Sequence, residues 1–222
     1  MTRPDRRSRP FAPAIVALLV LLPLGCVNPF KPADPEPPSG DVVPEKFGTI
    51  EELLDTMAKG IESRSTTGTD AYLHALAEST KFGDRAFRAF YDPTVKQIWL
   101  TAPQHIAPEP WDITLERRLP SYLFTKRPGA AAYQFQWTTD ITSPIDDIGS
   151  DTALVHRHYQ LLAAPKSGVV ETIAIGIADL SVEFDGSRWS LFRWNDRVDP
   201  NVGATPANPE DRTFSWRRLE SL

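Results

Sequence analysis

Apolar positions recur at helical spacing over residues 49–61. They are Ile50, Leu53, Leu54, Met57, Ala58 and Ile61. Thr49 and Glu52 form a capping box, in which the threonine side chain accepts from the first helical turn and the glutamate reaches back. The pattern therefore predicts an amphipathic helix that begins after Thr49 and buries one face.

Two further helices are expected. Residues 66–70 read as a break, and residues 71–79 as a second, shorter helix that forms a hairpin with the first. Its inward residues would be Tyr72, Leu73, Leu76 and Ala77. A third helix is expected from about Trp111, with a kink or restart at Pro120, because proline disrupts a helix interior.

Strand patterns fill most of the remaining chain. Alternation predicts strands over residues 85–93, 131–140, 152–163, 170–184 and 189–196, and Asp185-Gly186 predicts the hairpin turn between the last two. The order is two helices, a strand, a helix and then several long antiparallel strands. This order predicts an α+β fold in which N-terminal helices pack on one curved antiparallel sheet, forming a single domain over residues 47–222.

The first 25 residues have a different character. Four arginines lie within residues 1–10, and the uncharged run 11–24 follows. This run is shorter than the ~20 residues that a membrane-spanning helix needs. A basic start, a short apolar segment and a small residue before the cut are typical of a secretory signal peptide, here residues 1–25.

Leu24, Gly25 and Cys26 resemble the lipobox of bacterial lipoproteins, although Pro23 departs from that pattern. The resemblance implies cleavage after Gly25 and acylation of Cys26, the one cysteine of the chain. A buried structural thiol is the alternative, but Cys26 lies between a signal core and a proline-rich segment. Val27, a residue other than aspartate after the lipidated cysteine, implies the outer membrane where the cell has one.

Residues 26–46 are expected to form a tether. Six prolines favour extended polyproline II structure, which would reach up to roughly 60 Å from the bilayer. Removal of residues 1–25 takes four arginines and one aspartate from the 24 basic and 29 acidic residues, which leaves a formal charge of −8. A nucleic-acid partner is therefore not expected.

The element order and the final hairpin, residues 180–196 ending in Trp194-Asn195-Asp196, resemble the nuclear transport factor 2-like superfamily. The resemblance implies a cone in which helices and a curved sheet enclose a pocket. Tyr133, Phe135, Trp137 and Trp194 could line that pocket for a flat or apolar ligand, or could fill it as a packed core.

The catalytic candidates are Asp179 and His158. Asp179 shares a strand face with Ile173, Ile175 and Ile177, so it could act as a base in an apolar pocket, or lie where the strand leaves the core or bulges. His156 and His158 could form a metal pair, but a third ligand is not evident. We therefore expect neither a metal nor a cofactor, and a solvent-facing row of His156, His158 and Gln160.

Two functions follow as hypotheses. The first is a membrane-anchored, non-catalytic domain that binds a protein partner, a second copy or a small apolar ligand at the cell envelope. The alternative is an isomerase- or dehydratase-like enzyme acting on a small molecule in the cone pocket. A structural spacer with a solid core is a third, weaker possibility.

Overall fold

The computed structural model describes residues 42–78, 83–126, 130–139, 144–166, 168–200 and 213–222. The chain divides into a unit of residues 1–39 and a compact unit, Gly40–Leu222, and the fold below is that of the second unit. Gly25, Cys26 and most of the predicted tether lie outside the described residues.

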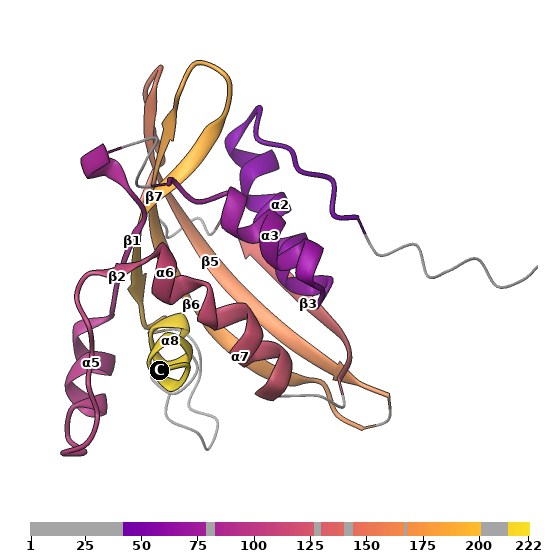
Figure 1. Cartoon of the computed structure of the whole chain (residues 1–222), viewed down its shortest axis with the longest axis vertical. Coiled ribbons are helices and arrows are strands. Elements are labelled where there is room, and N and C mark those ends of the chain that lie inside the picture. Colours follow the sequence, from indigo (N-terminus) through magenta and orange to yellow (C-terminus); the bar gives the residue numbers. More distant parts are fainter. Residues whose placement is uncertain (1–41, 79–82, 127–129, 140–143, 167, 201–212) are drawn as a thin grey trace, which may run out of the picture. The chain divides into compact units, whose positions relative to one another are not determined.

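The helical elements are α2 (Ile50–Glu62), α3 (Thr66–His74), η2 (Gly83–Arg85), α5 (Pro93–Trp99), α6 (Ile113–Glu116), α7 (Arg118–Lys126) and α8 (Phe214–Glu220). The strands are β1 (Arg88–Phe90), β2 (Trp111–Asp112), β3 (Ala130–Thr138), β4 (Asp147–Ile148), β5 (Thr152–Pro165), β6 (Glu171–Phe184) and β7 (Trp189–Arg197). Figure 1 shows their arrangement.

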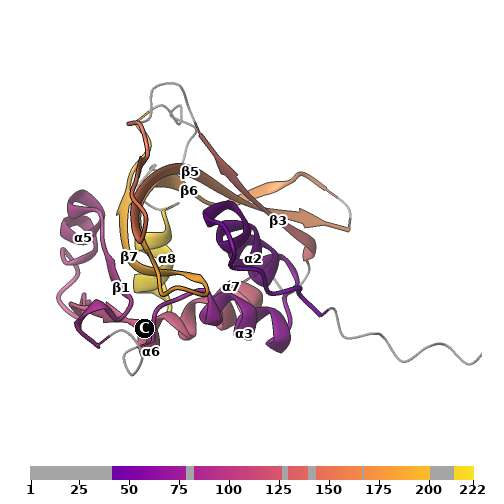
Figure 2. The same ribbon diagram turned by 90° about the horizontal axis from the view of Figure 1, so that it is seen from above.

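The strands form one sheet in the order β2-β1-β7-β6-β5-β3, with β4 paired to β5. Most neighbours are antiparallel, and β1 runs parallel to β7. Figure 2 shows the sheet curving around α2 and α8, with α3 and α7 beneath the same concave face. The predicted α+β class, helices packed on a curved antiparallel sheet, is confirmed.

Helix α2 forms as its sequence predicts. The Thr49 side chain accepts from the Glu52 amide at 3.1 Å, and Glu52 accepts from the Gly48 amide at 3.0 Å. Leu53, Met57 and Ile61 are fully buried on one face. The helix is held by its cap and by burial of this face, each large apolar side chain contributing about 1.5–3 kcal/mol.

The predicted start of the second helix was wrong. Ser65 caps α3 by accepting from the Gly68 amide at 3.0 Å, so residues 66–70 lie inside the helix. Gly68 fits because the two helices approach closely there. A Cβ at Gly68 would lie 2.5 Å from the Gly60 carbonyl oxygen, closer than side chains approach backbone in folded proteins. The glycine is a packing requirement and not a break.

The helix predicted from Trp111 divides into β2, α6 and α7. Asp112 caps α6 by accepting from the Thr114 and Leu115 amides, and the division falls at Arg117, before Pro120. Pro120 lies in the first turn of α7, where its missing amide hydrogen costs no helical hydrogen bond. The helix does restart, but at Arg117, so the predicted position at Pro120 was wrong by three residues.

The predicted strands are present, and two helices were not predicted. Gly186 has a φ of +92° in the turn between β6 and β7, which glycine adopts without strain. The strand predicted over 85–93 shortens to β1, since Asp92 caps α5 with Pro93 at its first position. Helix α8, which was not predicted, packs under the sheet against β6 and β7.

Candidate functional site

A buried polar centre lies beneath the concave face, at Glu116 of α6. Tyr72 donates to Glu116 Oε1 at 2.5 Å, and Trp111 Nε1 donates to Oε2 at 2.5 Å. Arg218 of α8 binds the same carboxylate through Nε at 2.8 Å and Nη2 at 2.9 Å. Both charged side chains are fully buried. The carboxylate is therefore held by four donors from three separate parts of the chain.

Burial and charge act together on these groups. Burial raises the pKa of the Tyr72 hydroxyl well above 10.0, and the neighbouring Glu116 carboxylate raises it further. Burial alone would lower the pKa of Arg218, but Glu116 reverses this effect, and the resulting pKa lies above that of an ordinary arginine. The Arg218 guanidinium is consequently charged and the Tyr72 phenol neutral at neutral pH.

A second buried carboxylate, Asp196 of β7, lies under the same face. Tyr159 of β5 donates to its Oδ1 at 2.7 Å, and the Ser215 amide donates to its Oδ2. The Tyr159 oxygen accepts in turn from the Phe214 amide at 2.9 Å. Burial raises the pKa of Asp196, while Arg218 opposes this rise. These bonds fix the start of α8 against β5 and β7.

The rings predicted to line a pocket gather in this interior. Phe135 lies 4.7 Å from Trp137, and Trp137 lies 5.5 Å from Trp194, between ring centroids. Tyr159 and Phe214 pack against the same cluster. Tyr133 donates to the Leu123 carbonyl oxygen at 2.5 Å, on the α7 side. The rings thus contact one another and the helices, as core residues do.

The polar centre was not found from the sequence. Glu116 lies three and seven residues before Leu119 and Leu123, so in the single helix predicted from Trp111 it would share their apolar face. A carboxylate on an apolar helix face needs a buried cation, and this spacing was the available signal. Arg218 gives no comparable signal, because α8 itself was not predicted.

Asp179 lies on the opposite, outer face of the sheet. We define the outer sheet face by the side chains of Gln136, His158, Gln160, Ile175, Ile177 and Asp179, which adjacent strands place in register. The sequence pattern correctly groups Asp179 with Ile175 and Ile177, which face away from the aromatic cluster. The grouping with Ile173 was wrong, because a register shift in β6 places Ile173 in the buried core. Asp179 accepts from Arg197 at 2.7 Å and lies 2.6 Å from His156 Nδ1.

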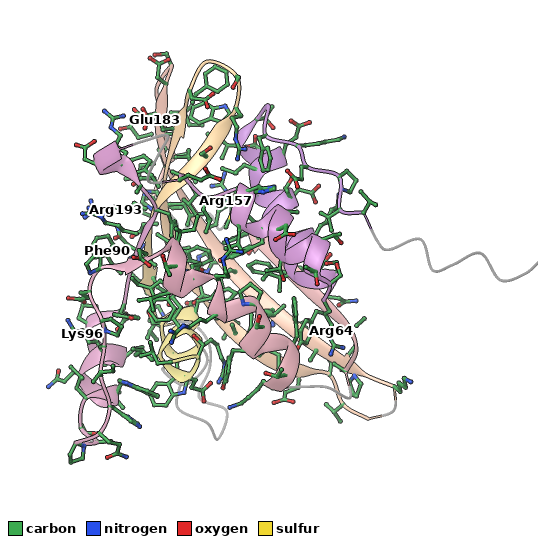
Figure 3. The ribbon with its side chains drawn as sticks, viewed as in Figure 1. Arg64, Phe90, Lys96, Arg157, Glu183 and Arg193 are labelled. Atoms are coloured by element: carbon green, nitrogen blue, oxygen red, sulfur yellow. The ribbon has the colours of Figure 1, made fainter. Side chains whose placement is uncertain are left out.

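The predicted solvent-facing row needs one correction. His156 is 9% exposed, because its ring pairs with Asp179 and its backbone amide donates to Asp146. The neighbouring Arg157, labelled in Figure 3, lies on the inner face and is held by Asp146 at 2.7 and 2.9 Å. Ion pairing therefore buries polar groups that the strand pattern alone assigns to solvent.

His158 lies beside a hollow on the outer sheet face. Its Nδ1 is 2.9 Å from Asp199 Oδ2. The hollow has a volume of about 440 Å³, and its lining comprises Gln136, Thr138, Thr139, His158, Tyr159, Gln160, Ile175 and Asp199. No described residue bonds to His158 Nε2. The structure thus separates the two catalytic candidates, with Asp179 in an ion-pair cluster and His158 at a hollow.

Metal-binding and membrane-spanning features are absent from the described residues. Within them, no group of three or more His, Cys, Asp or Glu side chains gathers as a metal site. Among the same residues, no helix has both the length and the apolar character that a bilayer span requires.

No protein-family model matches the chain, and no curated protein matches it. Several solved structures, in contrast, align with the chain. A substituted variant of Rv3472, a protein of unknown function from Mycobacterium tuberculosis, aligns with a TM-score of 0.49 at 11% identity, over 78% of this chain and 85% of that one. An NTF2-like protein with a cystatin-like fold from Novosphingobium aromaticivorans gives 0.47 at 11%, over 69% and 82%. Kfla4162 from Kribbella flavida gives 0.43 at 13%, over 67% and 86%. These are similarities of fold.

Proposed function

We propose that the protein is a lipid-anchored, non-catalytic binding domain of the bacterial cell envelope. Cys26 would carry the lipid and residues 27–46 would hold the domain away from the bilayer. The proposal rests on the signal sequence for the anchor and on the sheet for the binding site.

The observation that supports the non-catalytic part is that the two buried carboxylates, Glu116 and Asp196, are both occupied by donors from the protein itself. Glu116 accepts from Tyr72, Trp111 and Arg218, and Asp196 accepts from Tyr159 and from a backbone amide. A catalytic acid or base must reach a substrate proton. These carboxylates are instead fully engaged in joining α3, α6 and α8 to the sheet, which supports a structural role.

The hollow on the outer sheet face is the proposed binding site. Its volume of about 440 Å³ is in the range of small-molecule sites. Gln136 and Gln160 each offer an amide donor and an amide acceptor, and Ile175 provides an apolar side. The ligand we propose is a small uncharged molecule with several hydroxyl groups, of the sugar or polyol kind.

The test is a titration of the isotopically labelled mature protein with a panel of simple sugars and polyols, followed by nuclear magnetic resonance. Perturbed signals should gather at His158, Gln136 and Gln160. Gln136→Ala should weaken binding about fivefold to tenfold, the effect of a hydrogen bond worth about 1–1.5 kcal/mol.

The matched control is Gln134→Ala. Gln134 is exposed on the same strand and the same face, two residues from Gln136, and it does not line the hollow. Its substitution should leave binding unchanged. Equal losses in both variants, perturbations confined to Trp137 and Phe135, or binding of only a second copy or a protein partner would each contradict the proposed ligand site.

The pairing of His158 with Asp199 favours a second candidate function, proton transfer on the ligand in the same hollow. A carboxylate at Nδ1 fixes the tautomer of an imidazole and leaves Nε2 to act as a base. This candidate moves the isomerase- or dehydratase-like hypothesis from the cone interior to the outer sheet face. His158 is its one proposed base.

Proton transfer would be detected as exchange of carbon-bound hydrogen of a bound ligand for deuterium from heavy water. A base at His158 predicts exchange that His158→Gln abolishes while binding persists. The non-catalytic proposal predicts no exchange above that of the ligand alone. Exchange in the wild-type protein that is lost in His158→Gln thus distinguishes proton transfer from simple binding.

A further inference from the structure

A second hollow lies on the outer sheet face, where β1 pairs with β7. Its volume is about 220 Å³. The lining residues are Asp84, Arg85, Ala86, Arg88, Phe90, Phe192 and Arg193. Figure 3 shows Arg193 and Phe90 projecting side by side here, with Glu183 above them. Nothing in the proposed function uses this hollow.

Two of its arginines lie directly opposite one another. Arg88 of β1 and Arg193 of β7 are partners in the strand register, so their side chains leave the same face. Both are exposed, and no described carboxylate lies within ion-pair distance of either. Like charges in such positions destabilise a sheet. An anion between the two guanidinium groups would remove this repulsion.

Other arginines of the same face have carboxylate partners. Arg85 binds Glu183 at 2.7 Å, and Arg197 binds Asp179 at 2.7 Å. The hollow also contains the exposed carboxylate of Asp84, which forms no ion pair with a described residue. Because Glu183 neutralises Arg85, the charges that remain in the hollow are the guanidinium groups of Arg88 and Arg193 and the carboxylate of Asp84. The hollow therefore has a net positive charge in an acidic protein.

Aromatic side chains position the cations. The Arg193 guanidinium lies over the Phe90 ring, 4.6 Å from its centroid. Phe192 lies at a register shift, where Ser181 pairs with Arg193 and Val182 pairs with Leu191. Such bulges redirect side chains and are common near functional sites. Here the bulge places the Phe192 ring in the wall of the hollow.

We propose that this hollow binds a phosphate monoester. A phosphate monoester carries a charge of about −1.5 to −2 at neutral pH, which matches two arginines held side by side. The planar guanidinium groups can each donate two parallel hydrogen bonds to its oxygens. The phenylalanine rings would contact the esterified group. The phosphate could belong to a free metabolite or to a lipid headgroup.

The test is calorimetric titration of the mature chain carrying Cys26→Ser, which has no lipid of its own, with phenyl phosphate and with inorganic phosphate at constant ionic strength. Arg88→Gln and Arg193→Gln should each weaken binding about tenfold or more, because each removes hydrogen bonds to a charged group. Both residues are exposed, so thermal unfolding should confirm folded variants.

Lys166→Gln is the control. It removes the same charge from an exposed position at the far end of the β5–β6 hairpin, and binding should not change. A parallel titration with phosphatidylcholine vesicles, with and without phosphatidic acid, distinguishes a lipid headgroup from a soluble phosphate monoester. Binding to phosphatidic acid vesicles alone assigns the site to a headgroup, and binding to phenyl phosphate assigns it to soluble monoesters. Binding to neither, or equal weakening by Lys166→Gln, would overturn the proposal.

Discussion

Glu116 and Arg218 lie 102 residues apart in the sequence and form a doubly hydrogen-bonded ion pair in the core. Neither side chain contacts solvent. The pair joins α6 to α8, and the Arg218 guanidinium also lies 4.5 Å from the centroid of the Trp194 ring. The last helix of the chain is thereby attached to the sheet and to the helix that precedes α7.

Replacing one member of this pair should be strongly destabilising. Arg218→Met leaves the Glu116 carboxylate buried without its cation, and we expect the free energy of unfolding to fall by about 3–5 kcal/mol. Urea denaturation followed by tryptophan fluorescence measures this change. The double variant Glu116→Leu with Arg218→Met should recover part of the loss, because no uncompensated charge is left.

The control for that measurement is Arg217→Met. Arg217 is the preceding residue and pairs with Glu220 at 2.5 Å in a more exposed setting. Its loss should lower the free energy of unfolding by less than Arg218→Met does, since partly exposed pairs contribute little. Equal effects of the two substitutions would show that the buried pair has no special part in stability.

Gly176 should not tolerate a side chain. A Cβ at this position would lie 2.4 Å from the Tyr159 hydroxyl oxygen and 2.7 Å from the Arg197 carbonyl oxygen. Gly176→Ala should therefore lower the free energy of unfolding by about 1–3 kcal/mol, the usual cost of overpacking. A Tyr159→Phe background removes the hydroxyl contact but keeps the contacts with the ring carbon Cζ at 2.8 Å and with the Arg197 carbonyl oxygen, so the same glycine substitution should cost less but still destabilise. An unchanged cost would rule out contact with the hydroxyl.

Stability should fall as pH rises through 10. Burial raises the pKa of Tyr72 and Tyr159 well above the ordinary value of 10.0, and the adjoining carboxylates add to the shift. In the unfolded chain these hydroxyls lose their protons near pH 10, whereas the folded protein retains them. The unfolded state is thus favoured above that pH, and the stabilisation is complete below it.

Ultraviolet absorbance of tyrosinate tests this pH dependence. Tyr72 and Tyr159 should ionise only together with loss of folded structure, and Tyr72→Phe should reduce the slope of unfolding free energy against pH above 10. Ionisation of all five tyrosines near pH 10 in a protein that is still folded would refute the expected shift.

Local signals were sufficient for much of the fold. The cap at Thr49 and the apolar spacing after it predict α2, because both depend only on residues within a few turns. Alternation predicts β5, β6 and β7, and Asp185-Gly186 predicts the turn between the last two. The ring residues Phe135, Trp137 and Trp194 were also grouped correctly, since side-chain direction follows from strand period.

Tertiary contacts account for what the sequence did not predict. Gly68 reads locally as a break, and its reason is the close approach of α2 and α3. The parallel pairing of β1 with β7 joins segments about a hundred residues apart, for which the strand pattern carries no signal. The partners of His156 and Glu116 lie on other elements, so their burial could not be read from their own strands and helices.

The most direct test of the proposed function is mass spectrometry of the N-terminal peptide of the protein isolated from bacterial membranes. We predict a peptide that begins at Cys26 and carries a diacylglyceryl group with a further acyl chain, and Cys26→Ser should move the protein to the soluble fraction. An unmodified Cys26 thiol, or an isolated protein that still contains residues 1–25, would contradict lipid anchoring. Either result would also contradict the placement of this domain at the membrane surface.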